Sequence, residues 1–193
     1  MKSIAVFCGS SNGNDEVILR DSYNLGKILA EKNIKLVYGG SKLGLMGSVA
    51  KGALDHGGEV TGVIPDFLKT KEVVHPNLTA LITTEDMHER KMKMHELSEG
   101  FIALPGGFGT FEELFEIVTW GQLGLHKNPI GLLNSNGYYD ELIAILKTMV
   151  RKDLLKKENF DLLLIAEDIE ELLKKMANFK PVAVPKWMNK NQT

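Results

Sequence analysis

Short apolar segments alternate with longer amphipathic segments along most of the chain. The short segments are rich in apolar and β-branched residues, as strands are, and the longer ones repeat apolar residues with the period of a helix. Strands are predicted at residues 4–8, 35–38, 60–64, 78–82, 101–104, 130–133 and 162–165. Helices are predicted at residues 15–32, 44–56, 86–97, 110–123, 138–151 and 169–178. This alternation predicts an α/β fold with a doubly wound, mostly parallel, Rossmann-like sheet.

Length and composition fit one globular domain. A chain of 193 residues with 44% hydrophobic and 25% charged residues can bury a sizeable core and cover it with polar groups. We expect a single Rossmann-like domain over residues 1–180 and a C-terminal tail over residues 181–193. No apolar run approaches the roughly 18 residues that cross a bilayer, and the one at residues 4–8 is too short for a signal-peptide core.

Charge and cysteine content narrow the partners and the compartment. A net charge of −2 gives no broad basic field, so we expect neither a nucleic acid polymer nor a membrane as partner. Cys8 is the only cysteine, which excludes an internal disulfide and a cysteine-rich metal site and fits a reducing, cytoplasmic location. The five histidines lack the spacing of a metal-ligand set, so no metal is expected.

Three glycine-rich segments follow predicted strands, at residues 8–11, 39–47 and 105–110. In open parallel sheets the ligand lies beyond the carboxyl ends of the strands, where these loops fall. Glycines there let the backbone approach a ligand, and the N–H groups that open the following helix favour a phosphate. Tight turns alone would also explain any one loop. Three such loops at one sheet edge favour a phosphorylated small molecule.

The loops differ from the common cofactor motifs. Leu45 and Met46 stand where a Walker A loop has Lys and Ser or Thr, so hydrolysis of a nucleoside triphosphate is not expected. The loop at residues 105–110 lacks the last glycine of the dinucleotide fingerprint and follows a late strand, which argues against a nicotinamide or flavin. No lysine lies in a convincing setting for pyridoxal phosphate. We therefore expect no cofactor.

Two adjacent cations, Arg90 and Lys91, follow a predicted helix start. Asp86 is the predicted N-cap, and Glu89 three residues later completes a capping box. Cations near the start of a helix interact unfavourably with its dipole, so another interaction is expected to compensate for them. A solvated basic face is the simpler interpretation, and a functional pair of cations is the alternative.

Residues 105–113 read PGGFGTFEE and, together with the run from Met87 to Lys91, resemble the PGGxGTxxE signature of the LOG family. This is the family of cytokinin riboside 5′-monophosphate phosphoribohydrolases, long mislabelled as lysine decarboxylases. The resemblance extends from residues 7–10 through 37–40 and 44–47 to 137–139, and it is greatest to bacterial members.

The resemblance implies hydrolysis of the N-glycosidic bond of an adenosine 5′-monophosphate type nucleotide, giving a free purine base and ribose 5-phosphate without a cofactor. It implies that Arg90 and Glu113 are catalytic. The substrate contacts that it implies are Gly9, Ser10, Gly40, Glu72, Met87, Lys91, Gly106, Gly107, Gly109, Thr110 and Thr119. The segment after Glu72 departs from the usual glycine-bearing form of the family.

The chemistry suits these residue types. Breaking the bond from sugar to base develops positive charge on the ribose, which a carboxylate such as Glu113 can stabilise while it orients water. Arg90 offers a permanently charged fork to phosphate or sugar hydroxyls. From pattern alone, Thr110 and Glu113 could instead form a capping box. Glu112 and Glu116 are expected to be solvated helix charges.

The segment at residues 111–123 is apolar on more than one face, and a neighbouring helix or a second copy of the chain could cover the excess. The family implies a homodimer with residues of both chains near the base. The alternatives to the hydrolase are a non-catalytic carrier of a nucleotide or molybdenum cofactor on the same fold, and a broader AMP nucleosidase.

Overall fold

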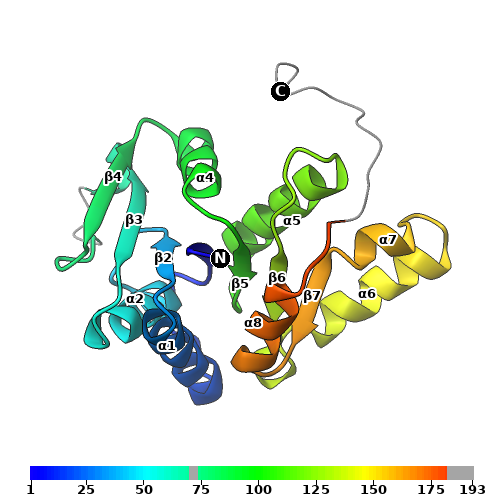
Figure 1. Ribbon diagram of the computed structural model, residues 1–193, viewed down its shortest axis with the longest axis horizontal. Coiled ribbons are helices and arrows are strands. Elements are labelled where there is room, and N and C mark those ends of the chain that lie inside the picture. Colours follow the sequence, from blue (N-terminus) through cyan, green and yellow to red (C-terminus); the bar gives the residue numbers. More distant parts are fainter. Residues whose placement is uncertain (70–73, 182–193) are drawn as a thin grey trace.

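A seven-stranded parallel sheet forms the centre of the computed structural model, which describes residues 1–69 and 74–181, and helices cover both of its faces (Figure 1). The strands are β1 (Ser3–Phe7), β2 (Lys35–Tyr38), β3 (Val60–Pro65), β4 (Ala80–Thr84), β5 (Phe101–Ala103), β6 (Ile130–Leu133) and β7 (Leu163–Ala166). Their spatial order is β4-β3-β2-β1-β5-β6-β7, and each neighbouring pair is parallel. The predicted doubly wound α/β fold is confirmed.

The strand order reverses between β1 and β5. The chain starts in the middle of the sheet, adds β2, β3 and β4 on one side, and then returns to add β5, β6 and β7 on the other. Ala5 pairs with Phe101 and Phe7 with Ala103 across this junction. The loops after β1 and β5 therefore diverge at their carboxyl ends, and this divergence opens a crevice suited to a ligand.

The helices and one 3-10 turn connect these strands. They are α1 (Glu16–Glu31), α2 (Gly44–Asp55), α3 (Asp66–Lys69), α4 (Met87–Glu96), α5 (Phe108–Gln122), η1 (Ser135–Gly137), α6 (Asp140–Arg151), α7 (Lys157–Phe160) and α8 (Ile169–Ala177). One core packs α1, α2 and α8 on the sheet through residues such as Leu29, Val49 and Leu172. The opposite core packs α4, α5 and α6, with Met94 and Leu114 fully buried. None of the helices within the described residues is long and apolar enough to cross a membrane.

Most boundaries lie within one residue of the sequence prediction, but β4 and the starts of α5 and α6 are each shifted by two residues. Strand β4 was expected at residues 78–82 and runs from Ala80 to Thr84, because it is an edge strand with mostly exposed residues and the apolar pattern does not mark its ends. Helix α5 begins at Phe108 instead of residue 110, because Gly107 takes the extended N-cap conformation. The short helices α3 and α7 have four residues each, too few for a helical period to show. Of the predicted tail, residues 182–193 lie outside the described residues.

Helices α1 and α2 pack with their backbones in close approach at two glycines. A Cβ atom on Gly52 would lie 2.0 Å from the carbonyl oxygen of Tyr23, and one on Gly26 would lie 2.0 Å from that of Val49. Since a backbone oxygen cannot move without its helix, a side chain at either position would push the helices apart.

The Gly52→Ala variant is therefore expected to lose about 1–3 kcal/mol in the free energy of unfolding. Urea unfolding followed by circular dichroism measures this loss. Gly109→Ala is the matched control, because Gly109 is also helical and a Cβ there meets nothing within 4 Å; its stability should be unchanged or slightly raised. Equal unfolding midpoints for Gly52→Ala and the wild type would contradict this packing.

Candidate active site

A hollow of about 280 Å³ lies where the loop after β1, the end of β2 and the helices α2, α4 and α5 meet. Its wall includes eight of the residues that the sequence singled out, namely Gly9, Ser10, Met87, Arg90, Gly107, Gly109, Thr110 and Glu113. The crevice at the reversal of strand order and the predicted catalytic pair therefore coincide.

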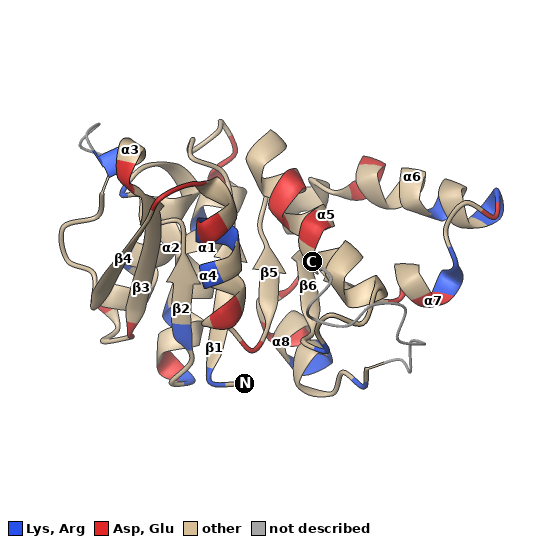
Figure 2. Ribbon diagram, turned by 90° about the horizontal axis from the view of Figure 1, so that it is seen from above, with Lys and Arg blue, Asp and Glu red and all other residues tan. Residues whose placement is uncertain are grey.

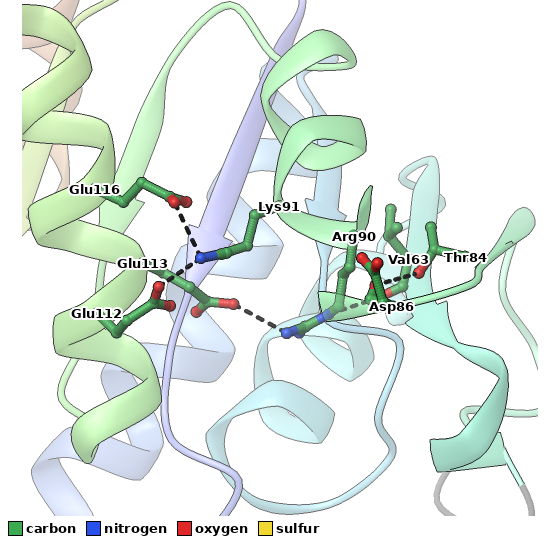
Figure 3. Close-up of polar contacts among 8 residues, drawn as sticks. All are labelled: Val63, Thr84, Asp86, Arg90, Lys91, Glu112, Glu113 and Glu116. Atoms are coloured by element: carbon green, nitrogen blue, oxygen red, sulfur yellow. Dashed lines mark hydrogen bonds and ion pairs between the residues drawn. The ribbon is translucent and has the colours of Figure 1, made fainter. Parts of the chain in front are cut away.

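Arg90 and Glu113 form a buried ion pair in this hollow (Figure 3). Arg90 Nη1 donates to Glu113 Oε1 at 3.1 Å, and Arg90 Nε donates to the Val63 carbonyl oxygen at 3.0 Å. The two residues are only 9% and 8% exposed, so the interpretation of Arg90 as part of a solvated basic face is wrong. Burial raises the pKa of the Glu113 carboxyl, and the Arg90 guanidinium beside it acts in the opposite direction.

The start of α4 holds Arg90 in place. Asp86 caps the helix as predicted, with Oδ1 accepting from the Glu89 N–H at 2.8 Å. Thr84 Oγ1, at the end of β4, donates to the Asp86 carbonyl oxygen at 3.1 Å (Figure 3). The Glu89 carboxylate bonds to the N–H of Glu85, one residue before the N-cap, instead of to that of Asp86. The cap fixes where the second turn begins and hence the side from which Arg90 enters the hollow.

Gly39, at the end of β2, is a site residue that the sequence reasoning passed over. A Cβ atom there would lie 2.2 Å from Arg90 Nη2 and 2.7 Å from Met46 Sδ, so only glycine leaves room for the guanidinium. Gly40, the expected contact, is not among the residues that line the hollow; its φ of +79° turns the chain, and its carbonyl oxygen accepts from the His75 N–H. The signals for Gly39 were its place in the glycine-rich segment 39–47 and in the family-like run 37–40.

The first turn of α5 presents backbone N–H groups to the hollow. Its N-cap, Gly107, contributes no capping side chain, so these groups are available to an anion. The capping box proposed for Thr110 and Glu113 is wrong, because the helix starts two residues earlier and Thr110 is already its third residue. Thr110 Oγ1 would lie 2.1 Å from a Cβ atom on Gly106, which shows how closely the loop folds over the threonine.

A second ionic cluster adjoins the pair. Lys91 Nζ donates to Glu112 Oε1 at 2.5 Å and to Glu116 Oε1 at 3.0 Å (Figure 3). Glu112 is 54% exposed, as expected for a solvated helix charge, and Glu116 is partly exposed, but both carboxylates also pair with Lys91. Lys91 is not among the lining residues of the hollow, and neither is Thr119, whose hydroxyl donates to the Phe115 carbonyl oxygen.

A neighbouring hollow of about 490 Å³ shares Gly9, Ser10 and Gly107 with the first and extends toward the start of α1. Gly106 lies in this second wall, and Tyr138 Oη donates to its carbonyl oxygen at 2.5 Å. Glu72, the remaining expected contact, lies outside the described residues. The two hollows together leave room for a ligand larger than either one.

No metal or thiol chemistry is indicated by the groups present. Residues 1–69 and 74–181 contain no group of three or more His, Cys, Asp or Glu side chains that could hold a metal ion. Cys8 lines the hollow, but burial raises the pKa of its thiol far above the ordinary value, so the sulfur stays protonated and a poor nucleophile.

A parallel sheet with glycine loops and a buried Arg–Glu pair at its reversal point defines a Rossmann-like protein with a site suited to a phosphorylated ligand. Residues 46–176 match the family model described as possible lysine decarboxylase. The chain is 44% identical over 91% of its length, and over 79% of the relative, to the probable cytokinin riboside 5′-monophosphate phosphoribohydrolase LOGL1 of Oryza sativa subsp. japonica. It is 41% identical over 94% of its length, and over 79% of the relative, to the corresponding enzyme LOG5 of Arabidopsis thaliana.

The chain belongs to the LOG family of phosphoribohydrolases. Among solved structures, the molybdenum cofactor binding protein of Rippkaea orientalis superposes with a TM-score of 0.69, covering 92% of this chain and 96% of that one. At 23% identity this likeness shows the shared fold only.

The Arg90→Met variant tests the buried pair. Without the Arg90 guanidinium, the pKa of the buried Glu113 carboxyl rises further, so the folded variant keeps a proton that the unfolded chain has lost. The free energy of unfolding of the variant should then fall relative to the wild type as pH rises from about 5 to about 8, with a loss of about 3 kcal/mol at the upper end. Urea unfolding at both pH values measures it.

The double variant Arg90→Met/Glu113→Gln is the control for this measurement. It has no titrating carboxyl at position 113, so it should lack the additional fall in stability that Arg90→Met shows between the two pH values. A single variant that runs parallel to the wild type would mean that Glu113 does not depend on Arg90 for its charge.

Proposed function

We propose that the chain hydrolyses the N-glycosidic bond of adenosine 5′-monophosphate type nucleotides, releasing the purine base and ribose 5-phosphate. The observation that carries this proposal is the carboxylate of Glu113, buried in a hollow beside a permanent cation and next to a helix start open to phosphate. The names of the curated relatives favour cytokinin riboside 5′-monophosphates as substrates.

The charges of the site suit the two ends of such a nucleotide. The N–H groups at the start of α5, around Gly107 to Thr110, would bind the 5′-phosphate. At the other end, Arg90 and Lys91 face three carboxylates, those of Glu112, Glu113 and Glu116, so the cluster carries a net charge of −1 when all five are ionised. A net negative cluster repels phosphate and stabilises a sugar that is becoming positive.

The reaction follows from this placement. As the bond from C1′ to the base nitrogen lengthens, its electron pair goes to the base, and positive charge builds on the ribose beside Glu113. Water then forms a bond to C1′ and gives a proton to the Glu113 carboxylate. The base, which leaves with the bonding electron pair, takes up one proton from solvent, and Glu113 returns its proton to solvent, so the carboxylate is restored. The products together contain the atoms of the nucleotide and one water.

Apolar side chains also line the hollow. Met46, Met87, Met94 and Phe108 line the same hollow, and flexible methionines adapt to flat or branched apolar groups. This lining suits a purine base and an apolar substituent on its N6 atom, and we propose N6-substituted nucleotides and AMP itself as the compounds to compare. A single buried cysteine suits a cytoplasmic setting for the reaction.

A carrier of nucleotide or molybdenum cofactor is the second candidate, because the Rippkaea orientalis protein of similar fold is named as a molybdenum cofactor binding protein. A carrier needs loops that hold phosphate but has no need for a carboxylate kept buried at a desolvation cost. The pair of Arg90 and Glu113 therefore favours the hydrolase.

Replacement of Glu113 by Gln tests the proposal. The amide oxygen can still accept from Arg90 Nη1, so the fold and nucleotide binding should persist. A neutral amide cannot stabilise the developing cation or take a proton from water, so turnover should fall about 100-fold or more. Release of free base from AMP and from N6-isopentenyl-AMP, with the melting temperature measured alongside, gives the result. Near-normal hydrolysis by this variant, or none by the wild type, would overturn the proposal.

We also propose that the chain works as a homodimer. Four large apolar side chains on α4 and α5 are exposed: Phe108 at 96%, and Met87, Met92 and Phe115 to a lesser extent; Met87 and Phe108 also line the hollow. Such a cluster on α4 and α5 is costly in water and suits a surface that a second copy covers.

Light scattering at micromolar concentration should therefore give the mass of two chains. Phe115→Asp should lower the measured mass toward one chain, because it places a charge in the covered surface. Leu154→Asp is the matched control: Leu154 is also exposed but follows α6, outside this cluster, and its replacement should leave the mass unchanged. A wild type with the mass of one chain would refute the dimer.

A further inference from the structure

We propose that Lys91 is a positioning residue, whose ammonium group holds Glu112 and Glu116 on α5 and offsets their charge so that Glu113 between them stays ionised toward Arg90. The effect on kinetics rests on the proposed function. The positioning of the carboxylates rests on the ion pairs alone. It gives Lys91 a role different from the direct nucleotide contact that the family resemblance implies.

The geometry places Lys91 between the helices and not in the hollow. Its side chain is only 9% exposed, and its Nζ atom lies 2.5 Å from Glu112 Oε1 and 3.0 Å from Glu116 Oε1. These two partners are one turn apart on α5, so a single ammonium group spans the turn that contains Glu113. Lys91 follows Arg90 directly on α4, so two neighbouring cations of α4 form ion pairs with neighbouring carboxylates of α5 (Figure 3).

The interaction joins the two helices that carry the catalytic pair. Acidic residues gather on α5, and the adjoining α4 carries both basic and acidic residues (Figure 2). The ion pairs of Lys91 bridge residues 21 and 25 positions apart, and the pair of Arg90 and Glu113 bridges 23. Three carboxylates on α5 are thus fixed against two cations on α4, which orients Glu113 as well as neutralising its surroundings.

The charged and titratable groups that face Glu113 come from three elements: Arg90 and Lys91 on α4, Glu112 and Glu116 on α5, and the protonated Cys8 after β1. Both flanking carboxylates raise the pKa of Glu113, and both cations lower it. Removing Lys91 therefore takes away one lowering influence and leaves two raising ones uncompensated. The sign of the effect is fixed by this arrangement.

The variant Lys91→Met tests the inference. The acid limb of the profile of kcat/KM against pH should move upward by about one unit, because Glu113 would hold its proton to higher pH. A ¹³C NMR titration of the labelled glutamate carboxyls, with the signal of Glu113 identified by its absence from Glu113→Gln, should show the same upward shift without any need for turnover. Lys91→Arg should stay close to the wild type on both readouts.

Two further variants separate charge compensation from substrate contact and from a failure to fold. In Lys91→Met/Glu112→Gln/Glu116→Gln the flanking charges are gone, so the acid limb and the Glu113 signal should return to the wild-type position or below. In Glu112→Gln/Glu116→Gln, which keeps Lys91, both should move to lower pH. Melting temperatures identify variants that do not fold.

Each outcome supports or overturns one stated role of Lys91. A rise in KM for Lys91→Met with no movement of the acid limb or of the NMR titration would overturn the positioning role and make Lys91 a substrate contact. An upward shift that persists in the triple variant would overturn it as well. Absence of turnover in the wild type would count against the proposed hydrolase alone, because the NMR titration would still decide the role of Lys91.

Discussion

The buried ion pair between Arg90 and Glu113 is the interaction on which the site depends. A guanidinium group taken out of water costs free energy unless its N–H groups are bonded, and here the Glu113 carboxylate and the Val63 carbonyl oxygen accept from it. The pair requires a glycine at position 39, because a Cβ atom would occupy the place of the guanidinium. The ends of β2 and β3 and the helices α4 and α5 are thereby fixed around one arginine side chain.

The charges around this pair also suit a ligand that has a negative phosphate at one end and develops positive charge on its sugar during the proposed reaction. The uncapped start of α5 offers N–H groups to a phosphate. Further along α5, the cluster of three carboxylates with Arg90 and Lys91 carries one more negative than positive charge. In the proposed reaction, a nucleotide bound across this gradient would have its phosphate at the positive end and its sugar beside Glu113. The carrier hypothesis uses only the first of these ends.

The sequence predicted the sheet and its six long helices because buried parallel strands are continuous apolar runs and amphipathic helices show their period. It could not predict that Arg90 is buried, since that depends on Gly39 and Val63, which lie far away along the chain. Thr110 followed by Glu113 has the pattern of a capping box, but the extended conformation of Gly107 starts the helix earlier and frees Glu113. Local sequence patterns thus predicted the helices and strands, whereas tertiary contacts determine which charged side chains form ion pairs.

The most direct test of this account is a crystal structure of the Glu113→Gln variant with N6-isopentenyl-AMP bound. The account predicts the phosphate on the backbone N–H groups of residues 107–110 and the C1′ atom of the ribose beside the side chain of residue 113. A phosphate seated against Arg90, with C1′ turned away from residue 113, would contradict it.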